Sequence, residues 1–187
     1  MNTILEKFYK DHQVKPYISP DRDIEAWLLN PKPVPKRNME LLTDDLLAGD
    51  IILLWRIQFG TFTTETWFPK YFEYTYGIVA PKHLKTLVEK GYTVIETSFD
   101  SLNHLNTIMK KNILKSKGST GLSKMKSAVP DQAPHDHFSE EELASHFSIR
   151  GYKLTPKGEL ILEQYQYIVD RHPKKNLWAS EFLVDFL

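Results

Sequence analysis

Prolines and glycines divide this chain into short segments, and their spacing limits it to short helices joined by tight turns. Four glycines follow segments that can be helical: Gly60, Gly77, Gly91 and Gly118. Three prolines stand where a helix can begin: Pro69, Pro81 and Pro156. Glycine readily adopts the left-handed conformation that ends helices, and proline suits the first helical turn, where its missing N–H is not needed. The predicted fold class is therefore mainly α, within the α+β class.

The segment from residue 43 to residue 60 is predicted to be a helix that ends at Gly60. Thr43 can cap it, and Asp44 and Asp45 would then lie near the positive end of the helix dipole. The apolar residues that follow with helical spacing are Leu47, Ile51, Leu54 and Trp55. The run IILLW also fits a buried strand, because a short apolar run is compatible with either element.

Residues 69–97 predict a short helix from Pro69, a second helix from Pro81 to Gly91, and then a strand over YTVIET. In the second helix the inward residues are expected to be Leu84, Leu87 and Val88, and the outward residues Lys82, His83 and Lys85. Three helices followed by a strand are the order of a winged helix. The phrase APKHLKTLVEKGYTVIE resembles the place where the third helix of winged-helix proteins runs into the wing. The resemblance implies a winged-helix-like unit over residues 41–100.

Residues 1–40 are predicted to form a proline-rich N-terminal arm. Its aromatic anchors are Phe8, Tyr9, Tyr17 and Trp27, and it ends in NPKPVPK at residues 30–36. Alternating prolines favour an extended path and exclude a helix there. We expect the arm to lie across a folded unit; a proline-rich ligand for another protein is the alternative.

Charge clusters locally in a chain that is neutral as a whole. The 24 basic and 24 acidic residues cancel, so any attraction to nucleic acid must come from a local cluster. Residues 101–130 contain no acidic residue, and their lysines are Lys110, Lys111, Lys115, Lys117, Lys124 and Lys126. Apolar residues at helical intervals predict one helix up to Gly118, with a buried face made of Leu102, Leu105, Ile108, Met109, Ile113 and Leu114. A second short helix is expected from Ser123, and Pro130 stops the pattern.

The phrase ILKSKGSTGLSKMKSAV resembles the helix, extended loop and helix of SAP domains and of the N-terminal domain of transcription terminator Rho. The resemblance implies that residues 101–130 form such a module and that its loop and second helix approach nucleic acid. Hydroxyl groups and helix N-terminal amides can donate to phosphate oxygens, while lysines neutralise phosphate charge. The predicted contacts are Lys110, Lys111, Lys115, Lys117, Ser119, Thr120, Ser123, Lys124 and Lys126. A solvated lysine face without a ligand is the alternative.

Residues 131–187 are predicted to be a linker and a C-terminal helical cap. Ser139 can cap a helix that begins with three glutamates, whereas His135, Asp136 and His137 lack the converging ligands of a metal site. Thr155 can cap a further helix after a short strand, and one face of that helix would hold Ile161, Tyr165, Ile168 and His172.

Two features of this C-terminal part leave alternatives open. Arg150, Lys153 and Lys157 either touch a phosphate or are solvated bases. An apolar stripe near the chain end must be buried, either on this subunit or in a homodimer, and consists of Trp178, Phe182, Leu183, Phe186 and Leu187.

The composition argues against several classes of function. The absence of cysteine excludes disulfides, thiolate zinc sites and cysteine nucleophiles, and favours a reducing cytoplasm. The sequence shows no secretory signal and no uncharged apolar run near the roughly 18 residues of a membrane span, so no membrane association is expected. No nucleophile elbow, phosphate-binding glycine loop or kinase motif occurs, and neither catalysis nor a cofactor is expected.

The resulting hypothesis is a non-enzymatic nucleic-acid-binding or adaptor protein of bacterial or phage origin. It would contact the phosphates of DNA or RNA without reading bases. The order of PKYFEYTYGI before the lysine-rich module and YKLTPKGELIL after it is similar to uncharacterised proteins of Gram-positive bacteria and their phages. The alternative is a protein-interaction factor that acts on a host protein through the aromatic residues 67–76 or the C-terminal stripe, without binding nucleic acid.

Overall fold

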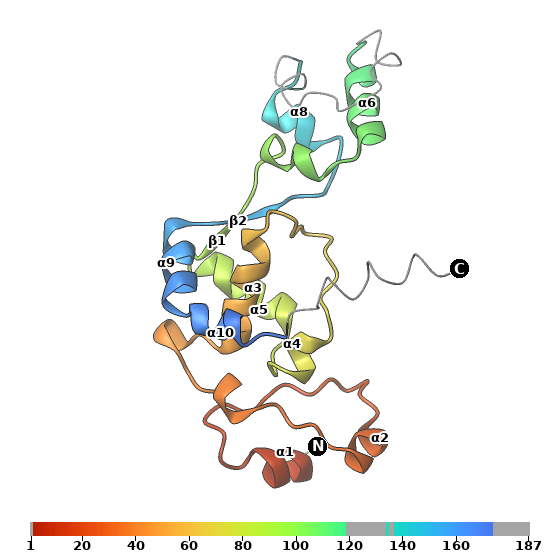
Figure 1. The fold of residues 1–187 in the computed structure, drawn as a ribbon. Helices are drawn as coiled ribbons and strands as arrows, with labels where there is room; N and C mark the ends of the chain where they lie inside the picture. The colour runs from red at the N-terminus through yellow and green to blue at the C-terminus, as the bar shows by residue number, and fades with distance from the viewer. Residues whose placement is uncertain (1, 119–133, 135–136, 174–187) are drawn as a thin grey trace, which may run out of the picture.

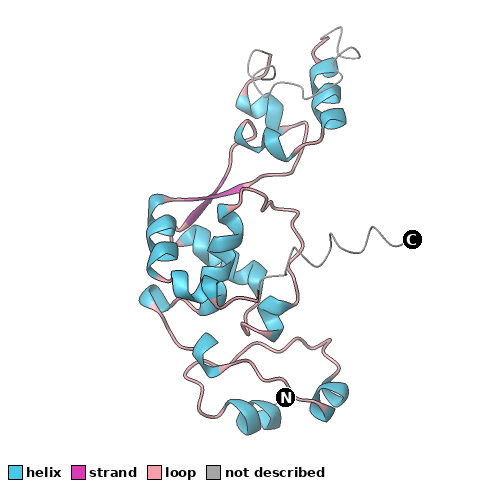
Figure 2. Ribbon diagram, in the orientation of Figure 1, coloured by secondary structure: helices cyan, strands magenta, loops and turns pink. Residues whose placement is uncertain are grey.

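Short helices are the main secondary structure of the described residues, and one small two-stranded sheet accompanies them there (Figure 2). The computed structural model describes residues 2–118, 134 and 137–173. The elements, with η for a single 3-10 turn, are α1 Asn2–Tyr9, α2 Ile24–Leu29, η1 Lys36–Asn38, η2 Thr43–Asp45, α3 Ala48–Gln58, α4 Tyr71–Tyr74, α5 Ala80–Glu89, β1 Thr93–Ile95, η3 Asp100–His104, α6 Thr107–Ser116, α8 Glu140–Ala144, β2 Tyr152–Leu154, α9 Pro156–Gln164 and α10 Gln166–Asp170. The prediction of a mainly helical α+β protein is confirmed.

Helix α3 is the centre of the main body, where it contacts α5, α9, α10 and β2. Its four residues from Ile51 to Leu54 are all 0% exposed. A helix that is apolar all round must be covered on every side. The run IILLW is therefore a helix, and the strand alternative is wrong.

The predicted start of this helix at Thr43 is also wrong. Residues Thr43–Asp45 form the separate turn η2, in which Asp44 and Asp45 have positive φ angles of 55° and 58°. The helix begins after Leu47, whose amide donates to the Asp50 carboxylate at 2.7 Å. The Asp44 carboxylate turns outward instead, to accept from the Tyr92 hydroxyl at 2.5 Å.

His83 lies on the inner side of α5, although the sequence placed it outward. Its Nδ1 is 2.8 Å from Oδ1 of Asp50, which is only 3% exposed. The same carboxylate that starts α3 therefore also binds α5. The inward positions Leu84 and Leu87 are confirmed as buried, because α5 packs directly on α3.

The sheet joins two segments that are far apart in the chain. Strands β1 and β2 run antiparallel, with Thr93 opposite Leu154 and Ile95 opposite Tyr152. The strand predicted after the third helix is thus present, but its partner comes from the C-terminal part of the chain. The complete winged-helix arrangement stays a prediction.

A small lobe is inserted between the two strands and stands apart from the main body at the end of two chain segments (Figure 1). It contains η3, α6 and α8. Its core is separate from that of the main body and consists of Leu102, Leu105, Ile113, Leu114, Phe138, Leu143 and Phe147. The long-range pairing of β1 with β2 therefore brings together the two chain segments that carry this lobe.

The N-terminal arm lies against helix α4, on the side of the main body away from the small lobe (Figure 1). Tyr9 is 0% exposed, and its hydroxyl accepts from the Val34 amide at 3.1 Å. The Tyr17 amide donates to the Gly77 carbonyl at 2.7 Å. The hydrogen bond between Val34 and Tyr9 thus holds the proline-rich segment against α1 instead of leaving it extended into solvent.

The last described helices follow the predicted pattern at their start. Thr155 Oγ1 accepts from the Gly158 amide at 3.2 Å, and Pro156 occupies the first turn of α9. The chain then breaks at Tyr165 into α10. Ile161, Ile168 and His172 are buried as expected, whereas the apolar stripe near the chain end lies outside the described residues.

Stability should fall as the pH drops below about 6.5, because the His172 imidazole is buried among aromatic rings. Its Nδ1 is 2.7 Å from the Tyr76 hydroxyl, and burial, aided by the charge of Arg56, lowers the pKa of His172. Below pH 6.5 the unfolded chain binds a proton that the folded imidazole does not, so the free energy of unfolding decreases.

Urea unfolding between pH 7.5 and pH 5.5 measures this decrease, in a range where carboxylates remain charged. His172→Gln should unfold at lower urea throughout and lose most of the pH dependence. An equal pH dependence in the variant and the parent would show that other groups cause it.

Candidate nucleic-acid interface

Helix α6 carries the described half of the lysine-rich segment. Asn106 caps it, since its Oδ1 accepts from the Met109 amide at 3.0 Å. Because of this cap, the predicted single helix from residue 101 is wrong: η3 ends at His104, and α6 begins as a new helix at Thr107. Gly118, with a φ of 78°, ends the helix region as predicted.

The faces of α6 agree with the predicted pattern only in part. Ile113 and Leu114 are buried in the small-lobe core, but Ile108 is 71% exposed. Lys115 and Lys117 are exposed, whereas Lys110 and Lys111 are half-buried. The chain turn before Asn106 rotates the helix relative to Leu102 and Leu105, so Ile108 no longer continues their face.

One predicted phosphate contact is an ion pair within the lobe. Lys117 Nζ lies 2.8 Å from Glu142 Oε1, and the hydrogen bond from Lys117 lowers the pKa of Glu142. The ammonium also lies 5.2 Å from the centre of the Phe138 ring. Both side chains of the pair are partly exposed, 35% for Lys117 and 51% for Glu142. The pair joins the C-terminal end of α6 to α8.

The remaining predicted contacts lie outside the described residues. They are Ser119, Thr120, Ser123, Lys124 and Lys126. The expected second helix of the module lies outside them as well. The structure thus places three of the predicted lysines in α6 and Lys117 at its C-cap, and leaves the predicted loop untested.

Helix α8 adds an acidic edge to the small lobe. Ser139 caps it as predicted, with Oγ accepting from the Glu142 amide at 3.2 Å. Burial raises the pKa of Glu140, but hydrogen bonds from the Ser98 and Phe99 amides outweigh this and the net pKa is lowered. In the described part of the lobe, basic residues lie on α6 and acidic residues on the first turn of α8, and the two groups meet in the pair of Lys117 with Glu142.

Three other basic residues that were candidates for phosphate contact are held by internal partners. Arg150 donates to the carbonyls of Phe147 and Ile149 at 2.8 Å. The ammonium groups of Lys153 and Lys157 form ion pairs with Asp100 and Asp44, at 2.8 and 3.2 Å. These contacts favour a structural role for the three residues over contact with a phosphate.

The neck of the lobe contains a polar cluster that the sequence did not reveal. Glu96 Oε2 is 3.2 Å from His104 Nε2, and both side chains are about nine-tenths buried. Ser101 Oγ accepts from the Gly151 amide at 3.0 Å and donates to the Thr97 carbonyl at 2.7 Å. The partners belong to the two chain segments that enter and leave the lobe, so this cluster orients α6 relative to the main body. Ser101 and Gly151 are 50 residues apart in the sequence, so no local motif indicates their contact.

Within the part of the chain that the structure describes, no three histidine, aspartate or glutamate residues are grouped as metal ligands. Two of the three residues considered above as metal ligands, His135 and Asp136, lie outside that part. None of the described helices combines the length and the apolar character needed to cross a membrane. Protein-family models, curated proteins and solved structures provide no match for this chain.

Proposed function

We propose that this protein binds the phosphate backbone of DNA or RNA through its small lobe, as a non-enzymatic adaptor. One observation carries the proposal: α6 contains three lysines and no acidic residue, Lys117 follows at its C-cap, and the helix belongs to a lobe with its own core that extends from the main body. The segment after Gly118 would add Lys124 and Lys126. The main body would then hold the lobe in place.

The binding would depend on charge and not on base sequence. Each lysine that neutralises a phosphate releases a condensed counterion, which makes affinity fall with salt. Lys115 is exposed and has access to a phosphate directly. Lys117 would exchange Glu142 for a phosphate at little cost, because exposed ion pairs contribute little to stability.

Replacing Lys115, Lys117, Lys124 and Lys126 together by alanine should weaken binding about tenfold or more at 50 mM salt. It should also reduce the slope of log affinity against log salt by roughly 3 to 4, because each lost phosphate contact removes about 0.9. Fluorescence anisotropy with a 20-base-pair duplex and a single-stranded RNA measures both quantities and separates DNA from RNA.

A matched control changes four exposed lysines outside the lobe: Lys36, Lys70, Lys82 and Lys85. This variant has the same net charge as the first and should keep the affinity and most of the salt slope. The proposal is wrong if the parent protein shows no salt-sensitive binding to either probe, or if both variants lose affinity equally.

Protein interaction is a second candidate function, favoured by the exposure of Trp67. This indole is 75% exposed, whereas Phe72 and Tyr76 of the same aromatic segment are buried. Tryptophan is enriched among the residues that contribute most to protein interfaces. A partner recovered from bacterial lysate after nuclease treatment, and lost in Trp67→Ala, would favour this function over nucleic-acid binding.

A further inference from the structure

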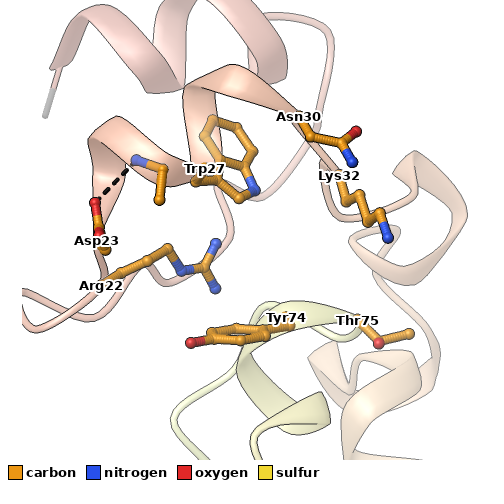
Figure 3. A pocket seen from close by; sticks show the side chains of 8 residues that line it. Arg22, Asp23, Trp27, Asn30, Lys32, Tyr74 and Thr75 are labelled. Carbon is orange, nitrogen blue, oxygen red and sulfur yellow. Dashed lines mark hydrogen bonds between the residues drawn. The ribbon is translucent and has the colours of Figure 1, made fainter.

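A hollow of about 440 Å³ lies between the N-terminal arm and helix α4, at the end of the molecule away from the small lobe. Figure 3 shows its walls, which are formed by α2, the residues that follow it and the end of α4. The lining residues are Arg22, Asp23, Ala26, Trp27, Asn30, Lys32, Tyr74 and Thr75. They come from two parts of the chain about 45 residues apart.

Several contacts fix these walls in position. Asp23 Oδ1 accepts from the Ala26 amide at 2.9 Å and caps α2. The Trp27 ring packs edge-on against Phe8, with 5.1 Å between ring centres. The hollow is therefore formed by the folded arm.

The Arg22 guanidinium is the most confined polar group of the hollow. Its side chain is only 6% exposed, and its centre lies 4.2 Å from that of the Tyr74 ring. Arg22 Nη2 is 2.6 Å from Glu73 Oε1, but the buried Nε has no hydrogen-bond partner. A buried donor without a partner is costly, and an acceptor from a ligand would relieve that cost.

Hydrogen-bond donors and flat rings dominate the rest of the lining. Figure 3 places the guanidinium between the Trp27 indole and the Tyr74 ring, with the Lys32 ammonium across the hollow. Asn30 adds an amide. The one carboxylate of the lining, Asp23, is engaged in capping α2. The cationic side chains Arg22 and Lys32 thus lie beside aromatic surfaces, and the Glu73 carboxylate already pairs with Arg22.

We propose that this hollow binds a small organic anion that carries a flat ring, the class to which nucleoside monophosphates and aromatic carboxylates belong. The anion would accept from Arg22 and Lys32, because a charge-assisted hydrogen bond is stronger than a neutral one. The ring would lie against Trp27, because aromatic side chains form sequence-tolerant stacking surfaces and the Arg22 guanidinium already lies over the Tyr74 ring. The site is independent of the lysines of the small lobe.

Calorimetry and the NMR signal of the Trp27 indole N–H test the proposal with four probes. Adenosine 5′-monophosphate and indole-3-acetate each combine the two features, a flat ring and an anionic group. Adenosine has only the ring, and inorganic phosphate has only the anionic group. The two-feature probes should bind at millimolar concentration or below, and the one-feature probes about tenfold more weakly. Comparing the monophosphate with indole-3-acetate distinguishes the two ligand sources.

Variants separate ligand binding from attachment of the arm. Lys32→Gln should weaken binding about threefold and leave the fold unchanged, because Lys32 is exposed. Lys36→Gln, in the same arm but outside the lining, should have no effect. Glu73→Gln removes the competing negative charge from Arg22, while its amide oxygen can still accept from the Ser19 amide.

Glu73→Gln should therefore bind the anions about threefold more tightly if Arg22 serves a ligand. If Arg22 serves only to hold the arm, the same variant should weaken or abolish any binding. The proposal is overturned by that result, by equal binding of adenosine and its monophosphate, or by the failure of both two-feature probes to shift the Trp27 signal.

Discussion

Replacing Leu143 by alanine should unfold the small lobe while the main body stays folded. Leu143 is 0% exposed in the small-lobe core, to which the described residues contribute seven buried side chains. A buried leucine-to-alanine change costs about 3–5 kcal/mol, which is large for so small a core. Hydrogen exchange should show lost protection in α6 and α8 and intact protection in α3, and nucleic-acid affinity should fall with the lobe.

A matched control for this change is Ile108→Ala in the same lobe. Ile108 is 71% exposed, so its loss should cost less than about 0.5 kcal/mol. Equal loss of protection in α3 and in α6 after the Leu143 change would mean that the two cores unfold as one unit. The main body would then depend on the lobe that it carries.

Replacing Gly158 by alanine should destabilise the main body by about 3 kcal/mol or more. A Cβ atom at this position would lie closer than 3.0 Å to the backbone carbonyl oxygen of Tyr92. That carbonyl cannot rotate away, because it also accepts from the Thr155 amide at 3.1 Å. In an open helix the same change would stabilise by roughly 1 kcal/mol, so the expected sign is opposite to that of helix propensity.

Gly60→Ala is the matched control for Gly158→Ala. Gly60 has a φ of 63°, and a Cβ there would meet nothing within 4 Å. Its replacement should therefore cost only the strain of the left-handed conformation, about 1 kcal/mol. Thermal or urea unfolding of both variants measures the difference. Similar losses in the two would show that α9 can move away from Tyr92 without cost.

The local signals of the sequence predicted several element boundaries. Ser139 and Thr155 cap helices α8 and α9, and Gly60 and Gly118 end helical segments with positive φ angles. Each of these features depends on residues no more than about four positions apart. The exception is Thr43, where the expected cap is absent because Asp44 bonds to Tyr92, which lies 48 residues further along the chain.

The candidate interface was predictable only as a list of residues. Apolar spacing predicted a helix that carries these lysines, but the cap at Asn106 begins a new helix in which Ile108 is exposed, and Glu142 pairs with Lys117. The partners in that pair are 25 residues apart. The sequence did not indicate the hollow at Arg22 at all, since its two walls meet only after the arm has folded against α4.

The sequence by itself determined the helical character, the helix caps and the charge contrast within the lysine-rich segment, because these depend on neighbouring residues and on composition. Only the tertiary structure decided which faces are buried, that β1 pairs with β2, and that the small lobe stands apart from the main body. Those properties depend on contacts between residues far apart in the chain, and no local pattern encodes such contacts. In the same way, the sequence predicted that lysines lie on a helix, whereas the fold placed Glu142 beside Lys117.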